Sequence, residues 1–392
     1  MKVVRDPIHG YIKLNSLEME VLDHKEMQRL RRIRQLGFTN LVYPSATHSR
    51  FEHSLGTFSL AGDFAESIAL GEQEKQEVKL AALLHDIGHT PFSHTNERFL
   101  RQGLNKDHEE IAEEKIMSSS LAETIEERGL SSKRISEIIQ GGGELGEIVS
   151  GKVDVDRMDY IQRDGYYTGV AHGTVGSDTI ILNAERKDGK IVFRKKGLTS
   201  LESFLVARYL MIPTVYLHHA SEIPEAMLRK AVEMEIKNGF ASGELKRMSD
   251  WELFSYLGNS ELEPVKDLIE RLRKRDLYKT ATKISPEEMT KKQYMELSEK
   301  VEKNRTEIAE EITKKTDAEK SEVLVHVLKP SPSQEKNARV ISESNMVTLK
   351  ELSPLVQQVE NTIWNHISID LYAPEEKLEE VRKAGEEVLN SF

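Results

Sequence analysis

The 392-residue chain contains no cysteine. Disulfides, zinc–thiolate sites, iron–sulfur clusters and a cysteine nucleophile are therefore excluded. The chain also lacks any apolar run near the ~18 residues that are needed to span a bilayer, and its first residues show no signal-peptide pattern. From these absences we expect a cytoplasmic protein that has no membrane partner.

Charge of both signs is abundant, because charged residues make up 31% of the chain and apolar residues 38%. This balance is typical of a soluble, largely helical protein, and the length favours one large domain with additions. The chain has 66 acidic and 55 basic residues, a net charge of −11, which argues against a broad nucleic-acid-binding surface. A small anionic substrate is still compatible, because a local arginine cluster can override the global sign.

Hydrophobic spacing predicts a mainly α-helical fold with short β-hairpins. One hairpin is expected over residues 1–14, around Asp6, Pro7 and Gly10, and a second around Asp188–Gly189. Helices are predicted over 16–36, 51–70, 74–85, 107–127, 131–140, 146–164 and, as long helices, 199–237. Loops are predicted at 141–143 and 165–173.

The composition changes after about residue 250. Residues 286–320 are rich in Lys and Glu and poor in large apolar groups, which predicts a solvated helical stretch outside the core. Strands are predicted at 321–328 and 364–374, a turn at 330–333 and a last helix over 374–389. We therefore expect three consecutive domains, 1–250, 251–316 and 317–392, of which the last is a small α/β subdomain.

The most informative pattern combines His53, the pair His85–Asp86 and Asp156. The pair ends the apolar run KLAALLH, where buried polar groups are costly unless something binds them. Adjacent helical residues project about 100° apart, close to the angle between neighbouring ligands of an octahedral metal. A helix C-cap hydrogen bond is the commoner role of an isolated His–Asp pair. With His53 and Asp156, the pair predicts an open two-His, two-Asp site for Mn, Fe, Co, Ni or Mg.

The four residues lie within a series of five motifs that follow one another in a fixed order: DPIHG, QRLRRIRQLG, YPSATHSRFEHSLG, HDIGHTPFSH and DVDRMDYIQRD. In these motifs the chain, from about Lys2 to about Ala226, resembles the HD-domain deoxynucleoside triphosphate triphosphohydrolases. That family includes the SAM-and-HD-domain enzyme of vertebrates and bacterial relatives that lack the SAM domain. The resemblance implies an HD-domain helical bundle and a metal-dependent reaction. In that reaction, water attacks the α-phosphorus of a dNTP, the bond to the 5′-oxygen breaks, and deoxynucleoside and inorganic triphosphate are released.

The resemblance also assigns residues around the phosphates. The matching residues are His89, His94 and His108 at the scissile phosphate, Glu109 placed to orient the last of them, and Arg50, Arg157 and Arg208 along the triphosphate. Two positions depart from the family pattern. Glu97 stands where the family usually has an aspartate, and Arg157 replaces a lysine of the vertebrate enzyme.

Further matches concern the nucleoside. Gln35 and Asp164 match residues that bind the 3′-hydroxyl, and the neighbouring Leu36 is also expected to bind the substrate. Tyr160 matches the ring that packs under the sugar, where a 2′-hydroxyl would clash. Tyr216 matches the aromatic residue beside the base, but Leu217 replaces a polar residue of the vertebrate enzyme. The resemblance therefore implies a deoxynucleotide and leaves the preferred base open.

A second nucleotide site is implied near the N-terminus. The residues that match a guanine-nucleotide activator site between subunits are Lys2, Val3, Asp23, Gln28 and Arg31. If this match holds, the protein is an allosterically activated homo-oligomer, a dimer or more specifically a tetramer.

Two other functions stay open from the sequence. One is an HD-domain phosphohydrolase that acts on a nucleoside monophosphate, a cyclic nucleotide or single-stranded nucleic acid. The other is a nucleotide-sensing regulatory protein with little turnover. The intact metal set argues against a pure sensor, and three arginines argue against a substrate with a single phosphate.

Overall fold

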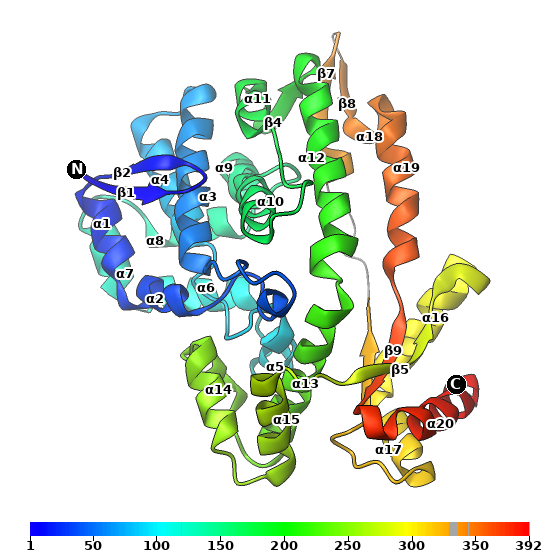
Figure 1. The fold of residues 1–392 in the computed structure, drawn as a ribbon. Helices are drawn as coiled ribbons and strands as arrows, with labels where there is room; N and C mark the ends of the chain where they lie inside the picture. Colours follow the sequence, from blue (N-terminus) through cyan, green and yellow to red (C-terminus); the bar gives the residue numbers. More distant parts are fainter. Residues whose placement is uncertain (119, 329–334, 344, 392) are drawn as a thin grey trace. The chain divides into compact units, whose positions relative to one another are not determined.

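The structure is a computed structural model. It describes residues 1–118, 120–328, 335–343 and 345–391, apart from the side chains of His94, Glu288, Glu360, Asn361 and Ile363. Helices dominate and the strands form small sheets (Figure 1), which confirms the expected mainly α-helical class. No helix in the described part of the chain is long and apolar enough to cross a membrane.

The chain forms two compact units, each assembled from three separate segments rather than from consecutive domains. Unit 1 comprises Met1–Ile212, Ser242–Trp251 and Ser333–Gln358. Unit 2 comprises Pro213–Ala241, Glu252–Pro332 and Val359–Phe392. The segment around residue 340 therefore belongs to the same unit as the five motifs.

Unit 1 is a helical bundle. Its helices are α1 (Ser16–Asp23), α2 (Lys25–Arg29), α3 (Arg50–Ser67), α4 (Glu72–Leu84), α5 (His94–Leu104), α6 (His108–Met117), α7 (Ser120–Glu126), α8 (Ser132–Ile139), α9 (Gly143–Ser150), α10 (Val155–Thr168), α11 (Ser177–Leu182), α12 (Leu198–Met211), α18 (Leu349–Leu352) and most of α19 (Pro354–Thr362). Helix α3 packs against α4 and α10, and α4 also packs against α8 and α9. The centre of the bundle is apolar, with Phe58, Phe64 and Leu80 fully buried.

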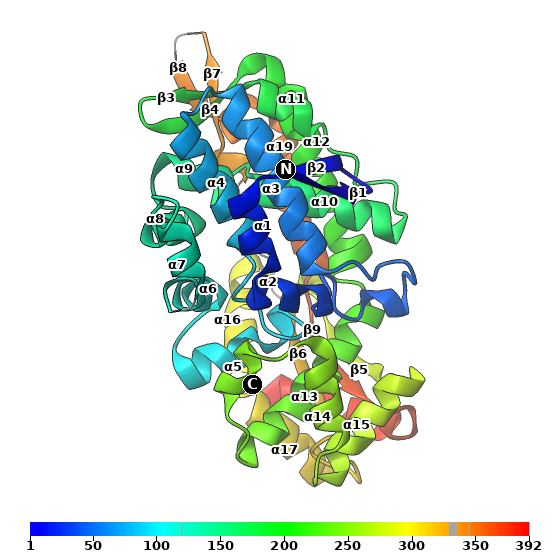
Figure 2. The same cartoon turned by 90° about the vertical axis from the view of Figure 1, so that its left-hand side faces the viewer.

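Two small sheets complete unit 1. Strands β1 (Lys2–Asp6) and β2 (Gly10–Leu14) form the expected N-terminal hairpin. The second expected hairpin is also present, as β3 (Ala184–Lys187) and β4 (Lys190–Arg194). Strand β7 (Arg339–Ser342) pairs in parallel with β4 and in antiparallel with β8 (Asn345–Thr348), so the sheet order is β3-β4-β7-β8. Figure 2 shows these four strands grouped together at the upper left.

Unit 2 combines helices with a three-stranded antiparallel sheet. Its helices are α13 (His219–Lys237), most of α14 (Asp250–Gly258), α15 (Glu263–Lys274), α16 (Lys291–Lys303), α17 (Arg305–Lys315) and α20 (Leu378–Ser391). Its strands are β5 (Lys279–Ile284), β6 (Leu324–Val327) and β9 (Ile369–Ala373), in the order β5-β9-β6. Helix α20 packs on β5 and β9.

Several expected boundaries were wrong for local reasons. The helix predicted over 16–36 breaks at His24, whose extended backbone ends α1 and whose ring caps α2. The segment predicted as one helix over 146–164 is divided between α9 and α10, because Gly151 is extended and Asp154 caps a new helix. Helix α5 was not predicted, and α10 runs past Gly165 to Thr168, where Gly169 adopts a left-handed conformation with φ of 74°.

The expectation that residues 286–320 lie outside a core was also wrong. Tyr294, Val301, Ile308 and Ile312 are fully buried and belong to the hydrophobic core of unit 2. They recur at helical spacing between charged residues, so α16 and α17 each bury one narrow apolar stripe. The turn expected at 330–333 lies outside the described residues.

Candidate metal and phosphate site

The first residue of the site lies in the first turn of α3. Ser49 caps this helix in a capping box, where Glu52 accepts hydrogen bonds from the Ser49 amide at 2.6 Å and hydroxyl at 2.8 Å. The cap sets where the helix starts and therefore which way its first turn faces. His53 lies in that turn and is only 1% exposed.

The end of α4 supplies the next two residues. Helix α4 ends at Leu84, and the His85 ring donates from Nδ1 to the carbonyl oxygen of Ala82 at 2.8 Å. Asp86 follows in the turn that continues into Gly88. A Cβ atom on Gly88 would lie 1.9 Å from the carbonyl oxygen of His108, so this glycine allows α6 to approach the turn.

Four side chains from three helical segments converge at this point. His53 Nε2 lies 3.2 Å from His85 Nε2, 3.0 Å from Asp156 Oδ1 and 3.8 Å from Asp86 Oδ2. His85 Nε2 lies 3.4 Å from Asp86 Oδ1 and 3.7 Å from Asp156 Oδ1. Potential ligand atoms of His53, His85 and Asp86 all fall within 4.8 Å of one another. The tertiary structure thus brings together the two-His, two-Asp set.

The hydrogen bonds of the two rings indicate that a cation fits between them. His53 Nδ1 donates to Asp159 Oδ2 at 2.8 Å, and His85 Nδ1 donates to a backbone carbonyl. In the neutral rings both Nε2 atoms therefore carry lone pairs, and these face each other across 3.2 Å beside a carboxylate. Such an arrangement is repulsive unless a positive charge lies between the rings. The donor set of imidazole and carboxylate suits a divalent metal ion.

The electrostatics of the site agree with this fit. Burial by itself disfavours a charged imidazole, but hydrogen bonds to Asp156 and Asp159 and the charge of Asp86 raise the pKa of His53 to about 10. The same negative potential that would hold a proton on this ring attracts a metal ion, which would compete with that proton.

A buried charge network behind the site was missed from the sequence. Asp159, one turn after Asp156 on α10, also accepts from His9 Nε2 at 2.6 Å and from Arg163 Nε at 2.9 Å. Arg163 is fully buried and donates in addition to Asp6 Oδ2 at 2.8 Å. This network connects DPIHG to DVDRMDYIQRD and orients His53, as carboxylates behind metal-binding histidines usually do. The signal in the sequence was the spacing of charged residues along one face of α10.

Close packing of α3 on α10 depends on one glycine. A Cβ atom on Gly56 would lie 1.9 Å from Asp159 Oδ1, so no larger residue fits there without moving this carboxylate. Gly56 therefore allows Asp159 to reach the His53 ring, one turn earlier on α3.

Two predicted catalytic histidines lie side by side next to the four converging residues. The His89 and His108 rings stack with centroids 4.3 Å apart, and His89 Nε2 lies 3.2 Å from Asp86 Oδ1. Glu97 accepts a hydrogen bond from His108 Nδ1 at 3.0 Å, so the residue that replaces the family's aspartate contacts this ring. His94 begins α5, but its side chain lies outside the described residues.

The pKa values of His89 and His108 are shifted in opposite directions. Burial, together with the charges of Arg50 and His108, lowers the pKa of His89 well below its usual value. Burial also disfavours a charged His108, but the hydrogen bond and negative charge of Glu97 outweigh it and raise the pKa of His108. Burial likewise raises the pKa of Glu109, which belongs to the same region.

The predicted phosphate-binding arginines are already engaged with protein groups. Arg50 is buried and donates to Asp86 Oδ2 at 2.7 Å and to Ser93 Oγ at 2.5 Å. Arg157 and Arg208 both reach Glu335, whose Oε1 lies 3.1 Å from the Nε atom of each.

A cavity of about 140 Å³ is lined by nine of the residues predicted for the metal, the catalytic groups and the substrate. The described residues that line it are Gln35, Arg50, His85, Asp86, His89, His108, Glu109, Ile139, Ser150, Asp156 and Tyr160. Neither Arg157 nor Arg208 is among them, although Arg208 Nε lies 3.4 Å from the Tyr160 hydroxyl. Arg157 and Arg208 therefore do not line this cavity, and Arg208 adjoins it through its contact with Tyr160.

The residues predicted to bind the nucleoside occupy different environments. The buried Gln35 Oε1 atom accepts no hydrogen bond from any described group. Asp164 is buried and lies 2.8 Å from His48 Nε2, and Leu36 is half-buried in the turn before Thr39. Tyr216 belongs to unit 2 and ends the π-helical turn Ile212–Tyr216. Its contact with a base therefore stays a prediction.

The residues predicted for the activator lie at the surface. Lys2 and Val3 are exposed on β1, and Asp23 is exposed at the end of α1. Gln28 Oε1 accepts from Arg31 Nε at 2.8 Å, and the Arg31 guanidinium lies over the Phe51 ring at 3.5 Å from its centroid.

Comparison with known proteins decides the family. A family model for the HD domain matches residues 50–164, and a model for the HD-associated region matches residues 175–391. The chain belongs to the HD-domain phosphohydrolase family. The HD-domain match contains His53, His85, Asp86 and Asp156, whereas Arg208, Tyr216 and Glu335 fall in the HD-associated region.

Some relatives of this HD-domain protein are named for an activity and others are named as uncharacterized. An uncharacterized protein of Methanocaldococcus jannaschii is 36% identical, over 98% of this chain and 81% of the relative. The deoxynucleoside triphosphate triphosphohydrolase SAMHD1 homolog of Dictyostelium discoideum is 32% identical, over 72% of this chain and 60% of the relative. A crystal structure of a phosphohydrolase from Bacteroides thetaiotaomicron aligns with a TM-score of 0.75 at 25% identity, over 96% of this chain and 100% of the other.

Proposed function

We propose that this protein hydrolyses deoxynucleoside triphosphates to deoxynucleosides and inorganic triphosphate. The observation that carries the proposal is the convergence of the two-His, two-Asp set with the buried Arg50 and with the stacked pair His89–His108. The similarity to proteins named as triphosphohydrolases supports the same substrate class, although the chain spans only 60% of the Dictyostelium relative.

A bound divalent ion and the Arg50 guanidinium would together supply the positive charge that a polyphosphate needs. When bound by His53, His85, Asp86 and Asp156, a divalent ion supplies charge that neutralises phosphate oxygens and favours ionisation of water. Arg50, held against Asp86, adds a fixed guanidinium beside the cavity. Burial keeps these charges strong, because few water molecules screen them.

The stacked histidines supply the proton transfers. Burial and the charge of Arg50 lower the pKa of His89, so this ring favours its neutral form and can accept a hydrogen bond from the attacking water. Glu97 raises the pKa of His108 and so favours its charged form, which can donate a proton to the 5′-oxygen that leaves the α-phosphorus. The pair thus combines a hydrogen-bond acceptor for water with an acid for the leaving group.

We expect Glu97→Gln to shift the alkaline limb of the pH profile of kcat to lower pH. Glu97 raises the pKa of His108, so its removal lowers that pKa. If His108 acts as an acid, activity is lost as pH rises through this pKa, and the loss then begins earlier. Glu113→Gln makes the same charge change at an exposed position on α6 and is expected to leave the limb in place. An unmoved limb in Glu97→Gln would show that His108 is not the acid.

The proposal includes regulation by a guanine nucleotide and assembly into a homo-oligomer. Asp23 supplies an exposed carboxylate, Arg31 an exposed guanidinium and Gln28 a half-buried amide, groups that can recognise a guanine and a phosphate. Lys2 and Val3 are exposed as well, so they are accessible to a second copy of the chain.

The test is incubation of the protein with each dNTP and Mn²⁺, with and without GTP or dGTP, and separation of the products by chromatography. Deoxynucleoside plus triphosphate is the expected result. Monophosphate plus diphosphate would show cleavage at another bond. Binding of nucleotide without any product would instead identify a sensor and overturn the proposed reaction.

A further inference from the structure

Glu335 occupies the place between two arginines where a phosphate would bind. Its Oε1 lies 3.1 Å from Arg157 Nε and 3.1 Å from Arg208 Nε, and its side chain is 1% exposed. Two guanidinium groups that converge on one oxyanion form the arrangement by which proteins hold phosphates. A buried carboxylate is costly unless cations lie close to it, and Arg157 and Arg208 supply such charge to Glu335, although Arg157 also pairs with Asp154.

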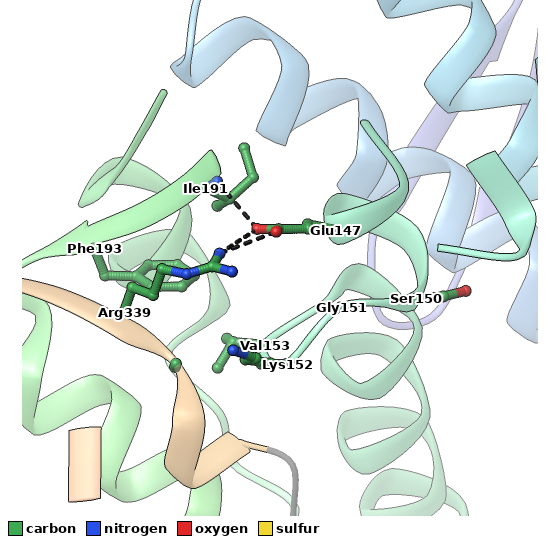
Figure 3. A pocket seen from close by; sticks show the side chains of 9 residues that line it. Glu147, Ser150, Gly151, Lys152, Val153, Ile191, Phe193 and Arg339 are labelled. Carbon is green, nitrogen blue, oxygen red and sulfur yellow. Dashed lines mark hydrogen bonds and ion pairs between the residues drawn. The ribbon is translucent and has the colours of Figure 1, made fainter. Parts of the chain in front are cut away.

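The segment that carries Glu335 is anchored a few residues further along. Arg339 donates to Glu147 Oε1 and Oε2 at 2.9 Å each, and Glu147 Oε2 also accepts from the Ile191 amide at 3.1 Å, as Figure 3 shows. Strand β7 pairs with β4 through Phe193 and Val340. These contacts hold β7 in place and leave Glu335 in the short 3₁₀ turn Glu335–Asn337 before it.

Two features bear on whether this turn has room to move. The residues that follow it, Ala338 and Arg339, border a cavity of about 310 Å³ that is partly open to solvent. The cavity at the four converging residues is only about 140 Å³, which is below the roughly 300–1,000 Å³ typical of small-molecule sites. A nucleoside triphosphate therefore needs more room than the described arrangement offers, and release of Glu335 would open the way to two further cations.

We propose that Glu335 is an internal competitor of polyphosphate for Arg157 and Arg208, and that bound polyphosphate displaces it. The inference rests on the proposed role of these arginines in holding the triphosphate of the substrate. In this arrangement the free protein is autoinhibited. Its apparent affinity for polyphosphate equals the intrinsic affinity multiplied by the fraction of molecules in which Glu335 has left the two arginines.

The experiment measures binding of inorganic tripolyphosphate by calorimetry in EDTA, so that no divalent ion contributes. Glu335→Gln is expected to bind roughly tenfold more tightly than the unmodified protein, because the amide pairs weakly with guanidinium. Glu343→Gln removes a carboxylate from the exposed β7–β8 turn and is expected to bind like the unmodified protein. The double variant Glu335→Gln, Arg208→Gln is expected to lose the gain. Equal or weaker binding by Glu335→Gln would overturn the proposal and make Glu335 a structural support of the arginines.

A second measurement uses the unmodified protein and so avoids variants that fail to fold. The Ala338 amide donates to the Glu335 carbonyl oxygen at 2.9 Å. Tripolyphosphate is expected to speed hydrogen–deuterium exchange in the peptide that contains Glu335–Ser342. Slower exchange there would contradict displacement.

Kinetics separate this inference from the proposed function. With the nucleotide that is hydrolysed, Glu335→Gln is expected to lower KM by a similar factor and to leave kcat nearly unchanged. If no dNTP is hydrolysed but Glu335→Gln still gains affinity for tripolyphosphate, the proposed reaction fails and the competition stands. If dNTPs are hydrolysed and the gain is absent, the competition fails alone.

Discussion

Asp156→Ala is expected to lower kcat by roughly a hundredfold or more, because even groups that only support metal ligands contribute ten- to a hundredfold. Asp156 Oδ1 lies 3.0 Å from His53 Nε2 and 3.7 Å from His85 Nε2, so its loss removes one of two carboxylates from the converging set. The measurement combines kcat with the amount of Mn²⁺ bound per chain. Both quantities are expected to fall together.

A matched control is Asp178→Ala, which removes an exposed aspartate from α11. It is expected to change neither kcat nor bound Mn²⁺. If Asp156→Ala kept its activity and a normal metal content, Asp156 would not be a ligand and the metal-dependent mechanism would need another donor.

Arg163→Met is expected to lower the free energy of unfolding by about 3–5 kcal/mol, because it leaves buried carboxylates without their cation. Arg163 is fully buried, contacts Asp159 Oδ2 at 2.9 Å and donates to Asp6 Oδ2 at 2.8 Å. Urea unfolding measures this change. Because Asp159 orients His53, the affinity for Mn²⁺ is expected to fall as well, by roughly ten- to a hundredfold.

Arg186→Met is the matched control for this prediction. Arg186 also pairs with two carboxylates, Glu74 at 2.9 Å and Glu144 at 2.7 Å, but its side chain is 41% exposed. Exposed ion pairs contribute about 0–1 kcal/mol, so only a small loss of stability is expected. A similar loss of unfolding free energy in both variants would mean that the buried network stabilises the protein no more than an exposed ion pair does.

Much of the first unit could be predicted from local sequence. Turn residues located both hairpins, and apolar residues located α3, α4 and α8 because more than half of the positions in each helix are buried. The prediction failed where one residue interrupts the pattern, as the extended His24 does between α1 and α2. It failed again in α16 and α17, where charged residues outnumber a narrow buried stripe that includes Tyr294.

The sequence by itself determined the kind of site, because the motif residues His53, His85, Asp86 and Asp156 combine imidazoles with carboxylates, and His85 and Asp86 end an apolar run. Only the tertiary structure decided which charged groups meet. Asp159 lies behind His53, Glu97 reaches His108, and Glu335 lies between Arg157 and Arg208. The physical reason is that the pattern of neighbouring residues in the sequence indicates whether a side chain is buried and on which face of a helix it lies. The charged group that it contacts is many residues away in the sequence, and the two meet only when the helices pack together.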